Sequence, residues 1–223
     1  LYAFWAKGFR SGGANFRTTT LNPASGNGAP RAFDSEEQSS FEIGLKRDFA
    51  DGRGRVNLAA FHNTLDAMQR ETNVPDLTGS GVQQVIVNAG EAVIYGAEID
   101  ARFRITNNFT ITGQVGYTHG QYETVTADLN GDGVVGNAPD LALQIPRLAP
   151  WTYGVNLIYD LPVMGGELSS RVGYNHRDPA FYNDSNRRFL AEADVIDANF
   201  TYSPDNGNWA ISLYGENLTD EVT

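Results

Sequence analysis

The chain has 223 residues, no cysteine, and a formal net charge of −11 from 16 Lys and Arg against 27 Asp and Glu. This acidic balance argues against nucleic acid as a partner, and the lack of cysteine excludes disulfides and thiol catalysis. No run approaches the roughly 18 apolar residues that a membrane-spanning helix needs. A helical membrane protein is therefore excluded.

Apolar and polar residues alternate along most of the chain, which predicts antiparallel β-strands. The clearest alternation runs over residues 92–104, where Tyr95 and Phe103 share one face while Glu98 and Arg102 share the other. In chain order, the pattern predicts about nine strands near residues 2–10, 41–46, 54–65, 92–104, 109–118, 151–159, 167–177, 193–203 and 209–217.

The connections between these strands alternate in length. The short ones are rich in Asp, Asn, Gly and Pro, as hairpin turns are, and they cover 50–54, 106–108, 162–166 and 204–208. The long ones cover 11–37, 66–83, 123–150 and 178–192. An outer-membrane barrel has this asymmetry, with tight periplasmic turns and long outer loops. A soluble β-sandwich has no reason to keep it in strict order.

Aromatic residues recur at a fixed spacing on the apolar face. Three pairs are each eight residues apart: Tyr95 with Phe103, Phe109 with Tyr117, and Trp151 with Tyr159. Eight residues of a tilted strand climb on the order of 20 Å, close to the height of a barrel's apolar band between its aromatic girdles. The alternative is a set of cross-strand aromatic pairs in a soluble β-protein.

Charged residues lie on the opposite face of the expected strands. They would be costly in a dry core, but they fit the wet lumen of a barrel. The charged residues of this face are Glu42, Lys46, Glu98, Arg102, Arg104 and Arg171. Lys46, Glu98, Arg102 and Arg171 could pair across the wall or line a transport path, and we expect pairing across the wall.

Several segments, taken in order, resemble the later barrel strands of TonB-dependent outer-membrane receptors. The segments YAFWAKGFRSGGAN (2–15) and FEIGLKRDF (41–49) are similar to two of that family's strands, and RVNLAAFHNTLDAMQ (55–69) to the next. Further matches are Asn88, Ala89 and Gly90 followed by Gly96, Ala97 and Glu98; Arg147, Pro150 and Trp151; and Asn217, Leu218, Thr219 and Asp220. No TonB box, plug domain or final aromatic-ended strand is recognised.

The resemblance implies an all-β fold: part of an antiparallel, up-and-down transmembrane β-barrel, with about nine of its roughly 22 strands. Residues 1–223 are then a partial barrel domain without the plug. Because the chain begins and stops within or beside expected strands, we expect it to be a piece of a longer receptor.

The same resemblance implies a function and a place for the parent protein. Such receptors lie in the outer membrane of Gram-negative bacteria, contact its lipid, and import a scarce small-molecule ligand such as a ferric siderophore, with cobalamin, haem or a glycan also possible. They are energised by the TonB complex through an N-terminal region. No catalytic motif points to an enzyme. Two alternatives stay open: a passive porin-type channel, and a secreted calcium-binding β-protein.

One long loop carries a candidate metal site. Asp128, Asn130, Asp132 and Gly133, in the string DLNGDG, match the opening of an EF-hand-type calcium loop. Position twelve is Pro139, and the nearest carboxylate, Asp140, comes one residue late. The sequence thus suggests Ca²⁺ in the 128–140 loop and requires no other cofactor. A metal-free turn rich in Asx and Gly explains the same residues.

Other residues in or beside the loops could meet a ligand. Arg187 and Arg188 suit an anionic chelate, or they could pair with Asp184 or Glu192. The aromatic residues could grip an apolar ligand or simply pack the loops; they are Phe9, Phe16, Phe33, Phe181, Tyr182 and Phe189. The histidines His62, His119 and His176 lie on different expected strands at no metal-ligand spacing.

Overall fold

The computed structural model describes residues 1–16, 32–75 and 82–221. Nine long strands form one antiparallel sheet in the order β1-β4-β5-β8-β9-β10-β11-β14-β15. Their bounds are β1 Tyr2–Arg10, β4 Glu36–Phe49, β5 Gly54–Asp66, β8 Gly90–Arg104, β9 Phe109–Val125, β10 Trp151–Val163, β11 Gly166–Arg177, β14 Ala193–Pro204 and β15 Ile211–Gly215. The predicted up-and-down strands are confirmed, although β4 and β9 extend farther toward the loops than the alternation indicated.

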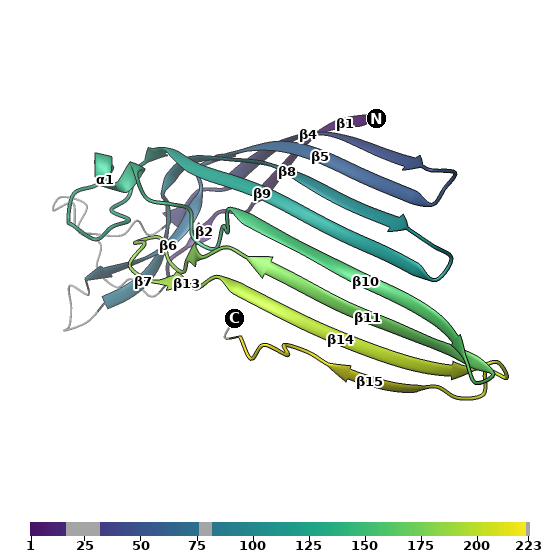
Figure 1. Ribbon diagram of the computed structural model, residues 1–223. Helices are drawn as coiled ribbons and strands as arrows, with labels where there is room; N and C mark the ends of the chain where they lie inside the picture. Colours follow the sequence, from purple (N-terminus) through teal and green to yellow (C-terminus); the bar gives the residue numbers. More distant parts are fainter. Residues whose placement is uncertain (17–31, 76–81, 222–223) are drawn as a thin grey trace.

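Short turns gather at one end of the sheet and long loops at the other (Figure 1). The loops contain elements that alternation did not predict: the pairs β2 Gly13–Ala14 with β3 Ala32–Phe33, β6 Gln69–Pro75 with β7 Val82–Asn88, and β12 Ala180–Phe181 with β13 Phe189–Leu190, and the helix α1 Ala138–Leu141. Within the described ranges, no helix is long and apolar enough to cross a membrane. Parts of two predicted loops, 17–31 and 76–81, lie outside the described residues.

Strand register separates the side chains into two faces. Tyr95 is opposite both His62 and His119, and Ile99 is opposite both Leu58 and Val115, so these side chains share one face. We call this apolar face the outward face. The opposite face carries Glu98 and its neighbours, and we call it the lumen face. The predicted alternation thus holds across strands as well as along them.

Aromatic rings on the outward face form two rows. The turn-side row contains the ring pairs Phe49–Phe103, Phe109–Tyr159 and Tyr202–Trp209, with centroids 5.7, 6.3 and 5.6 Å apart. The loop-side row contains the ring pairs His62–Tyr95, Tyr95–His119, Tyr117–Trp151 and Tyr153–His176. Two aromatic rows flanking an apolar band are the pattern of a barrel wall in lipid.

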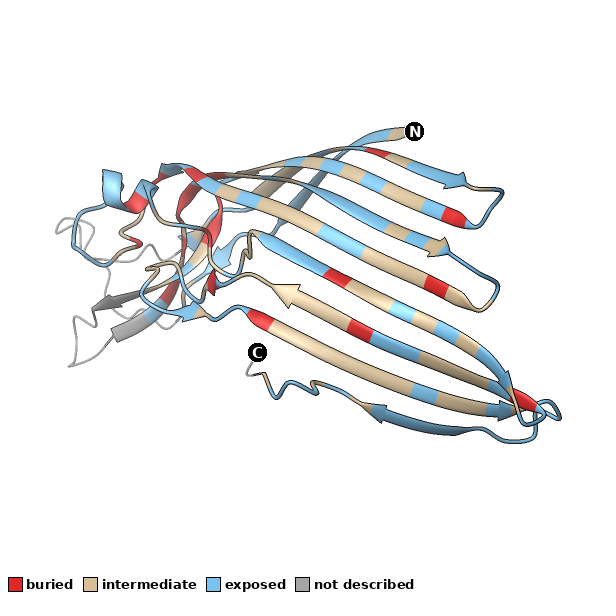
Figure 2. Cartoon of the chain, in the orientation of Figure 1, coloured by how far each residue is buried: buried red, intermediate tan, exposed pale blue. Residues whose placement is uncertain are grey.

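Burial is concentrated at the loop end of the molecule (Figure 2). On the outward face, large apolar side chains such as Ile99, Leu157 and Leu213 are exposed. Many large apolar side chains exposed on one face mark a surface that contacts a membrane or a partner rather than water. The core of this chain therefore lies among the loops, and the sheet is a wall rather than a layer over a core.

Candidate functional site

The loop end holds an apolar core made by three separate stretches of chain. Met68, Val85 and Val87 come from the β6–β7 region, which continues into the start of β8 with Ala89 and Ala92. Tyr122 and Val125 come from the end of β9, and Leu129 and Ile145 from the loop that follows. The complete buried set is Met68, Val85, Val87, Ala89, Ala92, Tyr122, Val125, Leu129 and Ile145. Alternation alone could not reveal this core, because its members meet only when the loops fold over one another.

A polar cluster joins this core to the 178–192 loop. Arg70 Nε lies 3.2 Å from Asp184 Oδ1, and the Tyr122 hydroxyl donates to the same carboxylate at 3.1 Å. Within the described part of the chain, Arg70 Nε has no aligned hydrogen-bond acceptor, so its contact with Asp184 is ionic. The pair is mostly buried, which makes its geometry matter more than that of a surface pair.

The first loop is tied to the β6–β7 pair by side-chain amides. Gln69 Nε2 donates to the carbonyl oxygens of Ser11 and Asp34, each at 3.0 Å, while the Gln69 backbone N–H donates to Glu36 Oε2 at 2.6 Å. Asn88 Nδ2 donates to the Asp34 carbonyl at 3.0 Å, and the Asp34 N–H donates back to Asn88 Oδ1 at 2.7 Å. These contacts hold the described residues of the β1–β4 loop against the β6–β7 pair.

The candidate calcium loop is a chain of Asx turns. Asp128 accepts from the backbone N–H groups of Gly131, Asp132 and Gly133, and Asp132 Oδ1 accepts from Val134. Asp132 Oδ2 receives the side-chain amides of Asn130 at 3.1 Å and Asn137 at 2.8 Å. The Asn137 amide, with the Val134 N–H, holds the pKa of the Asp132 carboxyl below its usual range.

Asp140, the carboxylate one residue late, has a structural role in that loop. It is fully buried and accepts from the backbone N–H groups of Leu129 and Asn130, both at 3.1 Å. It also completes a capping box with Asn137 at the start of α1. In the described ranges, no three His, Asp or Glu side chains converge as metal ligands, so any calcium shell here would include Asn or backbone oxygens.

The two loop arginines differ in their surroundings. Arg187 Nη2 donates to the Asn130 carbonyl at 2.7 Å, which links the 178–192 loop to the candidate calcium loop. Among the described residues, Arg187 forms no ion pair with Asp184 or Glu192, the acidic partners considered from the sequence. Arg188 is exposed beside exposed Phe189, next to Tyr182, whose ring lies 5.1 Å from the Arg147 guanidinium.

On the lumen face, charged and amide side chains pair across strands. Arg171 donates twice to Asn156 Oδ1, at 3.0 and 2.8 Å, and Tyr2 donates to Glu42 at 2.7 Å with Lys46 over its ring. Wall pairing is thereby confirmed for Arg171. Beside Arg171, a cavity of about 470 Å³ is lined by residues of β10, β11, β14 and β15, including Asp197 and Tyr214.

Comparison with known proteins gives a consistent answer. Residues 1–218 match the family described as TonB dependent receptor-like, beta-barrel. The chain belongs to the TonB-dependent receptor β-barrel family. Over 146 residues it is 33% identical to the metal-pseudopaline receptor CntO of Pseudomonas aeruginosa, a stretch that is 66% of this chain and 18% of that receptor.

Solved receptor structures share the fold. The ferric yersiniabactin uptake receptor FyuA from Yersinia pestis matches 98% of this chain and 29% of its own, with a TM-score of 0.73 and 18% identity. BauA, the ferric preacinetobactin receptor from Acinetobacter baumannii, matches 98% of this chain and 30% of its own, with a TM-score of 0.66 and 16% identity. The chain thus spans less than a third of the length of these relatives.

Family membership fixes the orientation of the faces and the ends. A TonB-dependent receptor barrel lies in the outer membrane of a Gram-negative bacterium. Its outward face meets lipid, its short turns face the periplasm and its long loops face the exterior. The apolar core, the Arg70–Asp184 pair and the Asx-turn loop therefore stand on the extracellular side.

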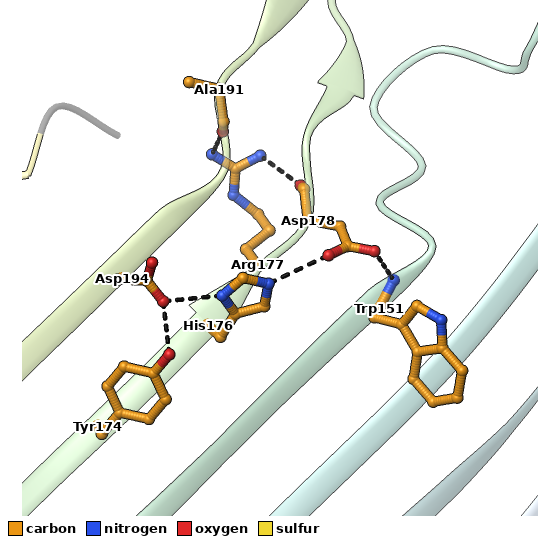
Figure 3. Close-up of polar contacts among 7 residues, drawn as sticks. All are labelled: Trp151, Tyr174, His176, Arg177, Asp178, Ala191 and Asp194. Atoms are coloured by element: carbon orange, nitrogen blue, oxygen red, sulfur yellow. Dashed lines mark hydrogen bonds and ion pairs between the residues drawn. The ribbon is translucent and has the colours of Figure 1, made fainter.

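A polar cluster around His176 was not predicted from the sequence (Figure 3). His176 Nδ1 lies 2.8 Å from Asp194 Oδ1, and its Nε2 lies 3.1 Å from Asp178 Oδ1. Tyr174 donates to Asp194, and the backbone N–H of Trp151 donates to Asp178 at 3.1 Å. Only strand register places His176 opposite Asp194, so no spacing within the sequence signals the cluster.

Proposed function

We propose that the full-length receptor containing this chain imports a metal ion bound to a small organic chelator, such as a ferric siderophore, using energy from the TonB complex. The observation that carries this proposal is the 33% identity to a protein named as a metal-pseudopaline receptor. The shared barrel shape of the ferric yersiniabactin receptor supports it. This chain would contribute part of the wall and a set of outer loops.

The long loops at the extracellular end are suited to binding because contacts among them already fix their positions. Ion pairing of Arg70 with Asp184 and the bonds of Gln69 hold three loops in place before a ligand arrives. Preorganised loops lose less conformational entropy on binding. Exposed Arg188 and Phe189 offer a guanidinium for an anionic chelate and a ring for its organic part.

Uptake in cells tests the proposal. A strain deleted for the full-length gene and its complemented parent are given radioactive iron bound to a panel of siderophores, with and without an uncoupler of the proton-motive force. We expect receptor-dependent uptake that the uncoupler abolishes. Uptake that persists with the uncoupler would instead support a passive channel, and no receptor-dependent uptake of any chelate would reject the metal-chelate proposal.

Arg188 provides a residue-level test of the same proposal. Loss of a charge-assisted hydrogen bond is worth about 1.5–3 kcal/mol, so Arg188→Ala should weaken chelate binding on the order of 10- to 100-fold. The matched control is Arg53→Ala, which removes an arginine from the β4–β5 turn at the opposite end. Equal affinities for the two variants, measured by calorimetry on the full-length receptor, would exclude Arg188 from the ligand site.

A second proposal is that the 128–140 loop binds Ca²⁺ through Asp128, Asn130 and Asp132. Its support is the spacing of these residues and the ionised state favoured for Asp132. A bound ion would replace the amide N–H groups of Asn130 and Asn137 that donate to Asp132 Oδ2. Carboxylate and amide oxygens at alternate positions are the ligands that Ca²⁺ prefers. A bound ion would stiffen the loop next to Arg187.

Calcium titration of the full-length receptor by calorimetry tests this second proposal. Asp132→Ala should abolish a binding signal that Asp205→Ala, in the β14–β15 turn, leaves intact. A wild-type receptor without a calcium signal, or one whose signal survives Asp132→Ala, would leave the Asx turns as purely structural.

A further inference from the structure

A shallow apolar groove of about 620 Å³ crosses the outward face over strands β8 to β11. Ala101 and Gly113 lie along it together with Val155, and Ile99 and Val115 stand on the same face one step nearer the loops. Tyr153, Tyr174 and Trp151 line the groove toward the loop end, and Gln114 and Gly154 complete the lining. A barrel wall covered uniformly by large side chains would have no such depression.

Gly113 opens this groove. A Cβ built at Gly113 would meet only the Gly154 carbonyl oxygen, 3.7 Å away, so the space above it is free. Its register neighbours on the same face are Ala101, which is also small, and Val155. Two small residues side by side lower the surface between taller neighbours.

The loop-side wall of the groove is held in position by the His176 cluster (Figure 3). Tyr153 stacks on the His176 ring with centroids 4.4 Å apart, and the Tyr174 hydroxyl donates to Asp194. His176 in turn contacts Asp194 and Asp178, and Asp178 receives the Trp151 backbone N–H. The network thus fixes the Tyr174 hydroxyl and the backbone at Trp151, and the His176 ring supports Tyr153 by stacking, which lets the groove keep its shape.

We propose that this groove is a binding site for one acyl chain of an outer-leaflet membrane lipid. Lipid covers the outward face of the family's barrels, and dispersion contacts favour a chain that fills a depression over one that lies on a flat wall. From Val155 to Trp151 the groove follows β10 for about 13 Å at about 3.3 Å per residue. That length lies within one leaflet of a hydrocarbon core about 30 Å thick.

The loop-side end of the groove sets the orientation of the lipid. Asp178, the first residue of the 178–192 loop, and Asp194, near the start of β14, stand beyond Tyr153 and Tyr174. Charged side chains at this level belong to the headgroup region. The polar end of the lipid therefore lies at this level of the wall, and the chain runs from there toward Gly113 and the bilayer centre.

Native mass spectrometry of the full-length receptor, extracted from outer membranes in mild detergent, tests the site. The variant Gly113→Leu fills the groove, and its backbone conformation suits a side chain because Gly113 has no positive φ. The matched control Ala60→Leu enlarges an outward residue of β5 outside the groove. Heat-modifiable migration on gels checks that all three proteins are folded.

We expect the wild type and Ala60→Leu to retain one lipid, and Gly113→Leu to retain roughly tenfold less, because each methylene displaced from apolar contact is worth a few-fold in affinity. Equal retention by all three folded proteins, or no retained lipid, would overturn the site. An adduct with the mass of an inner-leaflet lipid would also overturn it. So would the finding that the wild type is a dimer without bound lipid and that Gly113→Leu abolishes the dimer. Chelate uptake should be unchanged in Gly113→Leu, so this test is separate from the uptake test.

Discussion

The chain has two methionines, and they stand at opposite ends of the sheet in opposite surroundings. Met68 is 1% exposed in the extracellular core, while Met164 is 95% exposed in the β10–β11 turn. The loop end is held by tertiary contacts among segments distant in sequence. The turn end is held by short-range backbone geometry. Stability and binding should therefore respond differently to changes at the two ends.

The largest difference is expected from truncating the two methionines. Met68→Ala leaves a cavity in the loop core and should cost about 2–5 kcal/mol, whereas Met164→Ala should have no measurable effect. Because the strands of the wall remain paired, the loss should appear as faster hydrogen exchange at residues 84–89 rather than as unfolding of the sheet. Equal exchange in the two variants would show that the loop core does not hold the loops.

A smaller effect is expected from removing one carboxylate at each end. Asp184→Asn leaves the Arg70 charge, whose side chain is 23% exposed, without its ionic partner, and should cost about 1–3 kcal/mol before solvent screening reduces it. Asp48→Asn breaks the Arg55 pair, whose side chains are 65% and 55% exposed, and should leave the urea midpoint nearly unchanged because solvent screens the pair.

Limited proteolysis of the 178–192 loop and the urea midpoint of the full-length receptor measure these two effects. Adding Arg70→Met to Asp184→Asn should recover part of the loss, because the uncompensated charge is then removed. No recovery in the double variant would mean that Asp184 acts through Tyr122 alone.

The smallest effect concerns the turn between β4 and β5. Ala50 has a φ of 53°, Asp51 a φ of 54° and Gly52 a φ of 81°, so two non-glycine residues occupy the left-handed region. Ala50→Gly relieves about 1–2 kcal/mol of strain and adds about 0.5–1 kcal/mol of entropy cost, for a net stabilisation of up to about 1.5 kcal/mol. The opposite change, Gly52→Ala, should destabilise by a similar amount, and thermal unfolding that ranks the two variants otherwise would contradict this account.

The sequence predicted the wall well because each strand is specified by its own residues. Alternation identified all nine strands, and the eight-residue aromatic spacing placed rings in both rows, as Tyr95 and Phe103 illustrate. Strand ends were less well predicted: β4 begins at Glu36 and β9 ends at Val125, beyond the segments with the clearest alternation. Near the loops, pairing with a neighbouring strand extends these elements.

The candidate sites were predicted unevenly. The Asx and Gly pattern at 128–133 correctly indicated a compact turn-rich loop, since those hydrogen bonds are local. The partner of Arg187 was not found, because the Asn130 carbonyl lies 57 residues away along the chain. Calcium binding, the chelate and the role of Arg188 stay predictions.

By itself, the sequence determined the fold class, the two faces of the wall and which end carries long loops, because period-two alternation and turn chemistry act over a few residues. Only the tertiary structure decided that Met68 is buried in the loop core and that Arg70 pairs with Asp184. It also decided that His176 contacts Asp194 beside the groove at Gly113. Those contacts depend on strand register and loop packing, which join residues far apart in the chain and leave no periodic trace within it.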